Sequence, residues 1–346
     1  MQKQLSALGQ DPGPHDGLWG RKTKAAALGL MQQHPELQSE PMLQEPRRVS
    51  AISWCRILGK RRGVARAFRP SAEKPNILFD KDASPTEKAL VLGADKDARR
   101  YLYLRFGVSI AGRVDIAAGR DAKQVAANIV TLRRSRGDPI VDTRARVRKR
   151  CSDKDRWAAA AFYNQIFICW PQQDTYGADW AKQNRKRMTA ILVHEHIHTM
   201  QTEYTLAKTR LYKRPDGRRV SGPEWMMEGT AMVVELDYAF RNFEGQGMPS
   251  FFRLQSPARA SALKLADLGD ITTEEEYSIS LFAAYLLAER FGIQSLLEYW
   301  QAIGTGLDWD EAFQQVFGMK LAEYETQFET LRTHQSTAMN FIKTGS

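Results

Sequence analysis

The sequence has few cysteines and no long apolar run: 346 residues include only Cys55, Cys151 and Cys169, and no stretch approaches 18 apolar residues. A membrane-spanning helix needs about 20 predominantly apolar residues, so we expect no transmembrane segment. The cysteines lack C-x-x-C spacing, which argues against a structural zinc knuckle. One disulfide can form. The pair Cys151 and Cys169 is favoured because both fall in the large C-terminal domain predicted below, but spacing alone leaves the connectivity open.

The N-terminus also lacks the apolar core of a signal peptide. We therefore expect either a cytosolic protein or a chain whose export signal is upstream or removed. The formal charge of +10 attracts polyanions in general, whether nucleic acid, anionic lipid or cell-wall polymer. Because zinc-finger spacing and aromatic-basic RNA motifs are missing, no specific nucleic-acid partner is expected. With 43% apolar residues, the chain is too hydrophobic to be disordered.

The pattern H-E-x-x-H is present, formed by His194, Glu195 and His198. No Pro or Gly occurs from residue 178 to residue 214, so this segment is predicted to be one helix. A four-residue step places both imidazoles on one helix face, where they can bind one zinc ion. Glu195 projects about 100° further round the helix, beside the metal, where it can take a proton from water. His196 points off this face and is not expected to be a ligand.

A catalytic zinc site needs a third protein ligand and leaves a fourth position open for water. Glu228 is the candidate, because it sits in an otherwise apolar run where an unpaired carboxylate would be costly. Ser221 and Glu224 have the spacing of a capping box, and Pro223 suits a first helical turn, so a helix is predicted to start here. Taken alone, Glu228 is better explained by pairing with one of the many arginines. The H-E-x-x-H motif upstream favours the metal.

These motifs resemble the gluzincin group of zinc metallopeptidases, especially the peptidase-MA-like families, in which H-E-x-x-H is followed by P-x-W-x-x-E-G-x-A. The resemblance extends from about Lys74 to the C-terminus. It implies an α+β, zincin (thermolysin-like) fold with a small sheet and a mostly helical C-terminal part, Zn²⁺ as the cofactor, and a peptide or protein substrate. In that pattern Tyr277 matches the tyrosine that stabilises the oxyanion. Glu235 matches the carboxylate that orients a ligand histidine.

Residues 5–27 resemble the loop and second helix of the small helical peptidoglycan-binding domain. The matching positions are Gly9, Gly13, Asp16, Gly17, Gly20, Thr23 and Ala26. The first helix of that domain is clipped here, so we expect that the chain starts inside a domain, in agreement with the missing export signal. The resemblance implies a periplasmic, cell-envelope or secreted protein. An unrelated helical hairpin with a Gly-rich turn is the alternative.

We thus predict three parts: a truncated peptidoglycan-binding-like helical segment (1–38), a basic, Pro-containing linker (39–74) and a gluzincin-type metallopeptidase domain (75–346). Within the last part, we predict a strand at 76–80, a helix at 85–106, a strand or hairpin at 107–117, a helix at 121–136, an exposed loop at 137–156, a strand at 161–171, an irregular loop crossing the substrate cleft at 240–270, and helices from 274 onward. By resemblance, residues 162–170 form the sheet edge that binds extended substrate. A plain core strand is the alternative for that segment.

The leading hypothesis is a zinc-dependent peptidase at the bacterial cell envelope, with Glu195 as the general base. One alternative is a non-catalytic cell-wall-binding protein with a structural or vestigial zinc site. The other is a cytosolic basic protein that binds nucleic acid, for which strongly salt-dependent affinity would be the minimum support. The motifs leave the substrate open between peptidoglycan stem peptides and envelope proteins.

Overall fold

The structure is a computed structural model, and it describes most of the chain after residue 74. The described residues are 75–108, 110, 114–137, 140, 143–152, 156–162, 164–171, 177–209, 222–243 and 249–343. The predicted N-terminal segment (1–38), the linker (39–74) and Cys55 lie outside the described residues. Within the described ranges, no helix combines the length and the apolar character that crossing a bilayer requires.

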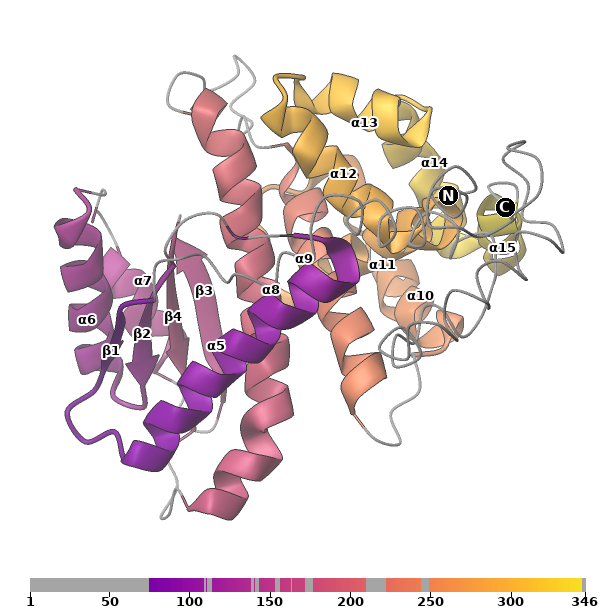
Figure 1. The fold of residues 1–346 in the computed structure, drawn as a ribbon. Coiled ribbons are helices and arrows are strands. Elements are labelled where there is room, and N and C mark those ends of the chain that lie inside the picture. Colours follow the sequence, from indigo (N-terminus) through magenta and orange to yellow (C-terminus); the bar gives the residue numbers. More distant parts are fainter. Residues whose placement is uncertain are drawn as a thin grey trace, which may run out of the picture. The chain divides into compact units, whose positions relative to one another are not determined.

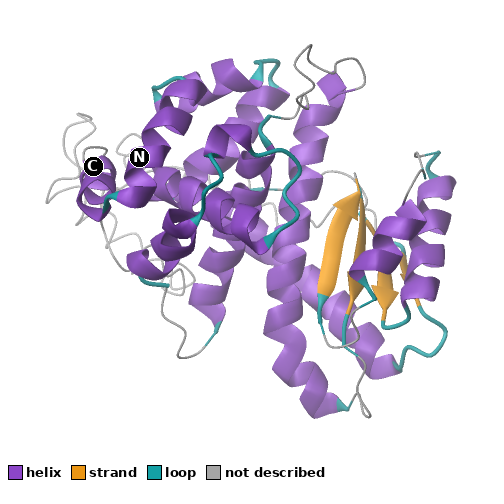
Figure 2. Ribbon diagram, turned by 180° about the vertical axis from the view of Figure 1, so that it is seen from behind, coloured by secondary structure: helices purple, strands orange, loops and turns teal. Residues whose placement is uncertain are grey.

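Four strands form one mixed sheet, in the order β1-β2-β4-β3 (Figure 2). The strands are β1 (Ile77–Phe79), β2 (Asp115–Gly119), β3 (Ala158–Phe162) and β4 (Gln165–Cys169). Strands β1, β2 and β4 are parallel to one another, and β3 runs antiparallel to β4 at the edge. The strand predicted at 76–80 is confirmed. Of the stretch predicted at 107–117, the last residues belong to strand β2, which continues to Gly119, whereas residues 109 and 111–113 lie outside the described residues.

The prediction of one long strand at 161–171 is wrong, because this region is a hairpin of β3 and β4. Asn164 lies in the turn between the two strands, a position that suits asparagine. The predicted assignment of residues 162–170 to the sheet edge is also wrong. Strand β4 is buried at every position between β2 and β3, whereas the alanine-rich strand β3 forms the edge. The run of apolar residues in β4 therefore marks an interior strand.

The sheet is covered by helices on both faces (Figure 1). The helices in this half are α5 (Pro85–Phe106), α6 (Ala122–Ser135), α7 (Thr143–Arg150) and α8 (Ala178–Thr209). Apolar side chains of α5 and α8 pack with Ile116 and Ile166 on one face of the sheet. On the other face, residues of α6 and α7 pack with Ala117 and Phe167. The helices predicted at 85–106 and 121–136, and the helix carrying the H-E-x-x-H motif, are confirmed.

Helix α7 contradicts the predicted loop at 137–156. Thr143 and Val147 are four residues apart and both are buried, whereas the basic residues between them are mostly exposed. These two buried side chains lie on the same face of the helix and pack it against α6. The other residues of this short helix are mostly basic, and for that reason its sequence resembles an exposed loop. Cys151, directly after α7, forms a disulfide with Cys169 at the end of β4. This is the pairing that the sequence favoured.

The C-terminal part consists of helices. They are α9 (Glu224–Asn242), α10 (Phe251–Ala260), the short 3-10 helix η2 (Leu265–Asp267), α11 (Glu274–Phe291), α12 (Ile293–Gly304), α13 (Trp309–Phe317), α14 (Leu321–Thr333) and α15 (Gln335–Lys343). The fold is therefore α+β and mostly helical, and the helices predicted from residue 274 onward are confirmed. The predicted irregular loop at 240–270 is wrong over α10. Buried Leu254 and Ala258 there hold a helix despite the internal Pro257.

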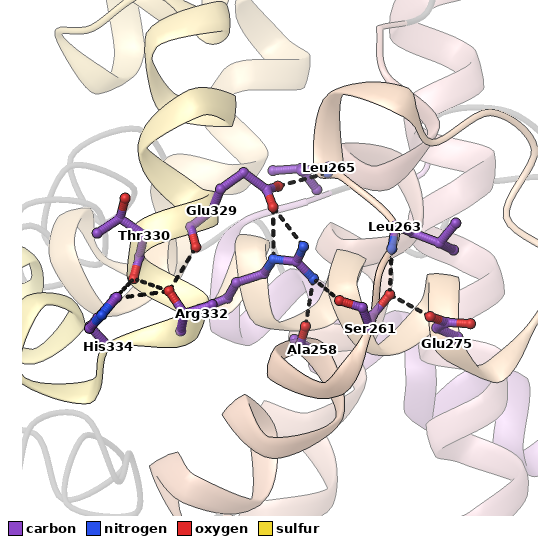
Figure 3. Close-up of polar contacts among 10 residues, drawn as sticks. Ala258, Ser261, Leu263, Leu265, Glu275, Glu329, Thr330, Arg332 and His334 are labelled. Carbon is purple, nitrogen blue, oxygen red and sulfur yellow. Dashed lines mark hydrogen bonds and ion pairs between the residues drawn. The ribbon is translucent and has the colours of Figure 1, made fainter.

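Polar contacts fix these helices to one another. Arg332 of α14 donates hydrogen bonds to the carbonyls of Ala258 (2.7 Å) and Ser261 (3.0 Å) and pairs with Glu329 (Figure 3). Arg332 is 6% exposed, so these acceptors replace most of the water that its guanidinium would otherwise bind. The end of α10 and the start of the following segment are thereby attached to α14.

Candidate metal centre

Helix α8 presents the two motif histidines on a half-buried face. Leu192, Val193 and Ile197 are completely buried in the core, and they fix how the helix is rotated against its neighbours. His194 and His198 are partly exposed on the adjacent face. Their ring centroids are 4.8 Å apart. The four-residue spacing thus produces the neighbouring imidazoles that the sequence predicts.

Glu228 on α9 faces both rings. Its Oε2 lies 3.5 Å from Nε2 of His194 and 3.4 Å from Nε2 of His198. The two Nε2 atoms are 3.0 Å apart. The structure therefore brings the three predicted ligands together, and their donor atoms all lie within 4.8 Å of one another. Among the described residues, this is the cluster of His, Cys, Asp and Glu side chains that can hold a metal ion.

The start of α9 differs in detail from the prediction. Pro223 is the N-cap residue, it has no side-chain capping bond, and Ser221 of the predicted capping box lies outside the described residues. Gly229, next to Glu228, allows α9 to approach α11 closely. A Cβ atom at Gly229 would lie 2.4 Å from the Ser280 carbonyl oxygen and 2.7 Å from the Ala284 side chain. Only glycine fits here, and it lets the helix carrying Tyr277 pack beside Glu228.

The outer nitrogens of both imidazoles are held by acceptors. Nδ1 of His194 lies 3.0 Å from Oε2 of Glu235, and Nδ1 of His198 lies 2.9 Å from Oε1 of Gln201. The Gln201 amide is oriented by its own donation to the Met227 carbonyl at 3.0 Å, so its oxygen must face the imidazole. A carboxylate and an amide oxygen only accept hydrogen bonds here, so both Nδ1 atoms carry the proton. In the neutral imidazoles, both Nε2 atoms therefore present lone pairs.

Lone pairs of two nitrogens and one carboxylate oxygen thus converge with no proton donor between them. Such an arrangement is repulsive unless a cation or an added proton occupies it. Burial lowers the pKa of His194, but Glu228 and Glu235 outweigh it and raise that pKa well above its usual value. Burial raises the pKa of Glu228, but His198 and His194 outweigh it and lower that pKa, so the carboxylate stays ionised. The site is built for positive charge.

Glu195 is buried beside this group, with 5% of its surface exposed. Its Oε2 has no hydrogen-bond partner among the described residues. Burial raises the pKa of its carboxyl group, while His194 and His198 act in the opposite direction. A carboxylate with a free oxygen and a raised pKa is suited to accept a proton.

Tyr277 lies in the first turn of α11, where a capping box of Thr273 and Glu276 starts the helix. Burial raises the pKa of its hydroxyl group, and so does the negative charge of Glu228. The phenol therefore stays protonated at neutral pH and can donate a hydrogen bond. The predicted residues Glu195 and Glu235 thus lie beside the two histidines, and Tyr277 is near enough to Glu228 for its charge to act on the phenol.

His196 faces away from this group, as its position in the motif predicts. Its Nε2 lies 2.8 Å from Oδ1 of Asp95, which in turn accepts a hydrogen bond from Arg99 on the same helix, α5. His196 is completely buried in the interface between α5 and α8. This contact attaches the motif helix to the sheet-bearing half of the fold.

Two residues at the site were missed in the sequence. Gln201 orients His198, and its position three residues further along α8 could have revealed it, because residues three apart share a helix face. Arg150, at the end of α7, acts electrostatically on Tyr277 and on Glu195. No local signal distinguishes it from the other basic residues around it.

The chemistry of the donor set indicates which metal fits. Two imidazole nitrogens and one carboxylate oxygen are typical zinc ligands, and three protein donors leave a coordination position open. No protein-family model, curated protein or solved structure matches this chain. Any functional assignment therefore depends on the motifs and on the geometry of this group.

Proposed function

We propose that this protein is a zinc-dependent peptidase of the gluzincin type, with a zincin fold. The observation that carries the proposal is the convergence of three lone-pair donors, on His194, His198 and Glu228, with both outer imidazole nitrogens already held. A buried carboxylate with a free oxygen, that of Glu195, lies beside them. A purely structural zinc site has no use for such a base.

His194, His198 and Glu228 would hold the zinc ion, and Glu235 and Gln201 would orient the two rings. When bound, zinc supplies Lewis acidity, which makes water more acidic and polarises a carbonyl group. Glu195 takes the proton of the attacking water as the water adds to the scissile carbonyl carbon. Its raised pKa then favours delivery of that proton to the leaving amine.

Tyr277 donates a hydrogen bond to the negative charge that develops on the carbonyl oxygen. Its protonated hydroxyl and its position near Glu228 support this role. A preorganised donor of this kind can contribute about 3 to 4 kcal/mol to catalysis. The donor comes from α11, so the close packing at Gly229 is part of the catalytic geometry.

The substrate is a peptide bound in an extended conformation along β3. The support is topological, because β3 is the antiparallel edge strand and lies beside α8. The outer edge of such a strand offers backbone groups for pairing with a peptide. Its side chains at positions 158–161 are alanines, which leave room for a second backbone.

The proposal also includes a cell-envelope location and attachment to peptidoglycan. Only the sequence of residues 5–27 supports this part. That segment lies outside the described residues. The non-catalytic alternative shares the same three ligands. It is disfavoured by the open coordination position and by the buried base.

The test compares the wild-type protein with Glu195→Gln, both loaded with zinc. Each is incubated with purified peptidoglycan and with an unfolded protein, and new termini are identified by mass spectrometry. We expect both proteins to retain one zinc ion by metal analysis, and only the wild type to generate new termini. Hydrolysis by Glu195→Gln at a near-normal rate would remove the base from the mechanism. A zinc-loaded wild type that cleaves neither substrate would favour the non-catalytic alternative.

A further inference from the structure

Arg150 extends from the end of α7 to the edge strand β3. Its Nη1 donates a hydrogen bond to the carbonyl oxygen of Ala159 on β3, at 3.4 Å. Its positive charge also acts electrostatically on Tyr277 and on Glu195. The side chain is half-buried. A permanent cation therefore lies on the β3 side of the metal-binding group.

Arg150 is not among the arginines that form a short ion pair with a carboxylate of the described ranges. Six arginines form such pairs at 3.0 Å or less: Arg99, Arg105, Arg136, Arg185, Arg241 and Arg332. The hydrogen bond that Arg150 donates goes to the Ala159 carbonyl, which is neutral. A guanidinium has five N–H donors, so several of them have no acceptor among the described residues. A partly desolvated charge with neutral partners is stabilised by binding an anion.

The backbone that carries Arg150 is fixed on both sides. Val147, one turn earlier in α7, is completely buried. Cys151, the next residue, is joined by its disulfide to Cys169 at the end of β4. The cation is therefore presented by a rigid part of the fold, which reduces the entropy lost when it binds a ligand.

We propose that Arg150 is a specificity-determining residue that binds a carboxylate group of the peptide substrate, and this inference rests on the proposed peptidase function. A peptide that pairs with the outer edge of β3 passes the Ala159 carbonyl, and Arg150 donates to that same carbonyl. The carboxylate is either the free C-terminus of the peptide or the side chain of an acidic residue. Arginine binds a carboxylate through two parallel hydrogen bonds, which gives both affinity and orientation.

The test measures binding, so that it does not depend on turnover. The Glu195→Gln protein, loaded with zinc, is titrated calorimetrically with two pairs of matched peptides. One pair differs only in a C-terminal carboxylate against a C-terminal amide. The other pair is amidated and differs only in Glu against Gln at each position in turn. We expect the carboxylate member of at least one pair to bind roughly tenfold or more tightly, as a charged hydrogen bond allows.

Substitutions at Arg150 then assign the preference. In the same background, Arg150→Gln should abolish it, and Arg150→Lys should keep part of it, because lysine retains the charge but not the paired donors. Arg148→Gln is the matched control: it removes one charge from an exposed position of the same helix and should leave the preference intact. Circular dichroism and thermal melting check folding, and the Lys variant keeps the test decisive where the Gln variant is unstable.

Three results would overturn the inference. They are equal binding within both peptide pairs, a preference that survives Arg150→Gln, and an equal weakening of all peptides by Arg150→Gln. The last would show that Arg150 only supports the fold. Failure of the proposed function is a separate result, because it appears as wild-type protein that binds these peptides but hydrolyses none.

Discussion

The hydrogen bond between Glu235 and His194 allows a quantitative prediction for zinc affinity. The two atoms, Oε2 and Nδ1, lie 3.0 Å apart, and the carboxylate fixes both the tautomer and the direction of the ring. Loss of such a supporting acceptor typically weakens metal binding about 10- to 100-fold. Glu235→Ala should therefore cost about 1.4 to 2.7 kcal/mol of zinc binding free energy. Glu235→Gln should cost less, because its amide oxygen can still accept from Nδ1.

Zinc affinity is measured by competition with a chromophoric chelator at fixed pH and ionic strength. The order of affinity should be wild type, then Glu235→Gln, then Glu235→Ala. Glu274→Ala serves as the control, since this exposed glutamate lies in the first turn of α11 and is not part of the metal-binding group. If Glu235→Ala bound zinc as tightly as the wild type, the hydrogen bond from Nδ1 of His194 would not support zinc binding. An equal loss of zinc affinity in Glu274→Ala would contradict the prediction as well.

Three further predictions follow from the same geometry. Glu228→Ala should lose or greatly weaken zinc binding, and metal analysis showing full retention would exclude Glu228 as a ligand. Tyr277→Phe should keep zinc and lower kcat about 10²- to 10³-fold, whereas an unchanged kcat would exclude it as the oxyanion donor. Burial raises the pKa of Asp237, but Arg105 and Arg241 outweigh it and lower that pKa to about 2. Because the folded pKa lies below the unfolded one, this carboxylate contributes about 2 kcal/mol of stability above pH 4 that is lost as the pH falls toward 2. Urea titrations should show Asp237→Asn less stable at pH 7, with a gap that narrows in acid; a gap independent of pH would contradict this.

The helices and the first strand could be predicted from sequence because their signals are local. A run free of Pro and Gly, a capping box and an apolar stripe each operate within a few turns. Three predictions failed where the deciding contacts come from elsewhere in the fold. Helix α7 resembles a charged loop until α6 covers Val147, and α10 resembles an irregular loop until Leu254 and Ala258 are buried. The sequence of the β3–β4 hairpin predicts one strand because both strands are apolar, and the turn between them is short.

The H-E-x-x-H spacing fixes which imidazoles are neighbours, but it does not fix which ring nitrogen is free. That choice depends on Glu235, which is supplied by α9, and on Gln201, whose amide is oriented by the Met227 carbonyl. Arg150 is more remote still, since its charge acts on Tyr277 and Glu195 only because α7 ends beside the edge strand and α11 packs against α9. Such roles depend on the meeting of segments that are far apart in the chain. They follow from the geometry of side chains and not from any motif, which is why the polar residues around a motif have to be read from the structure.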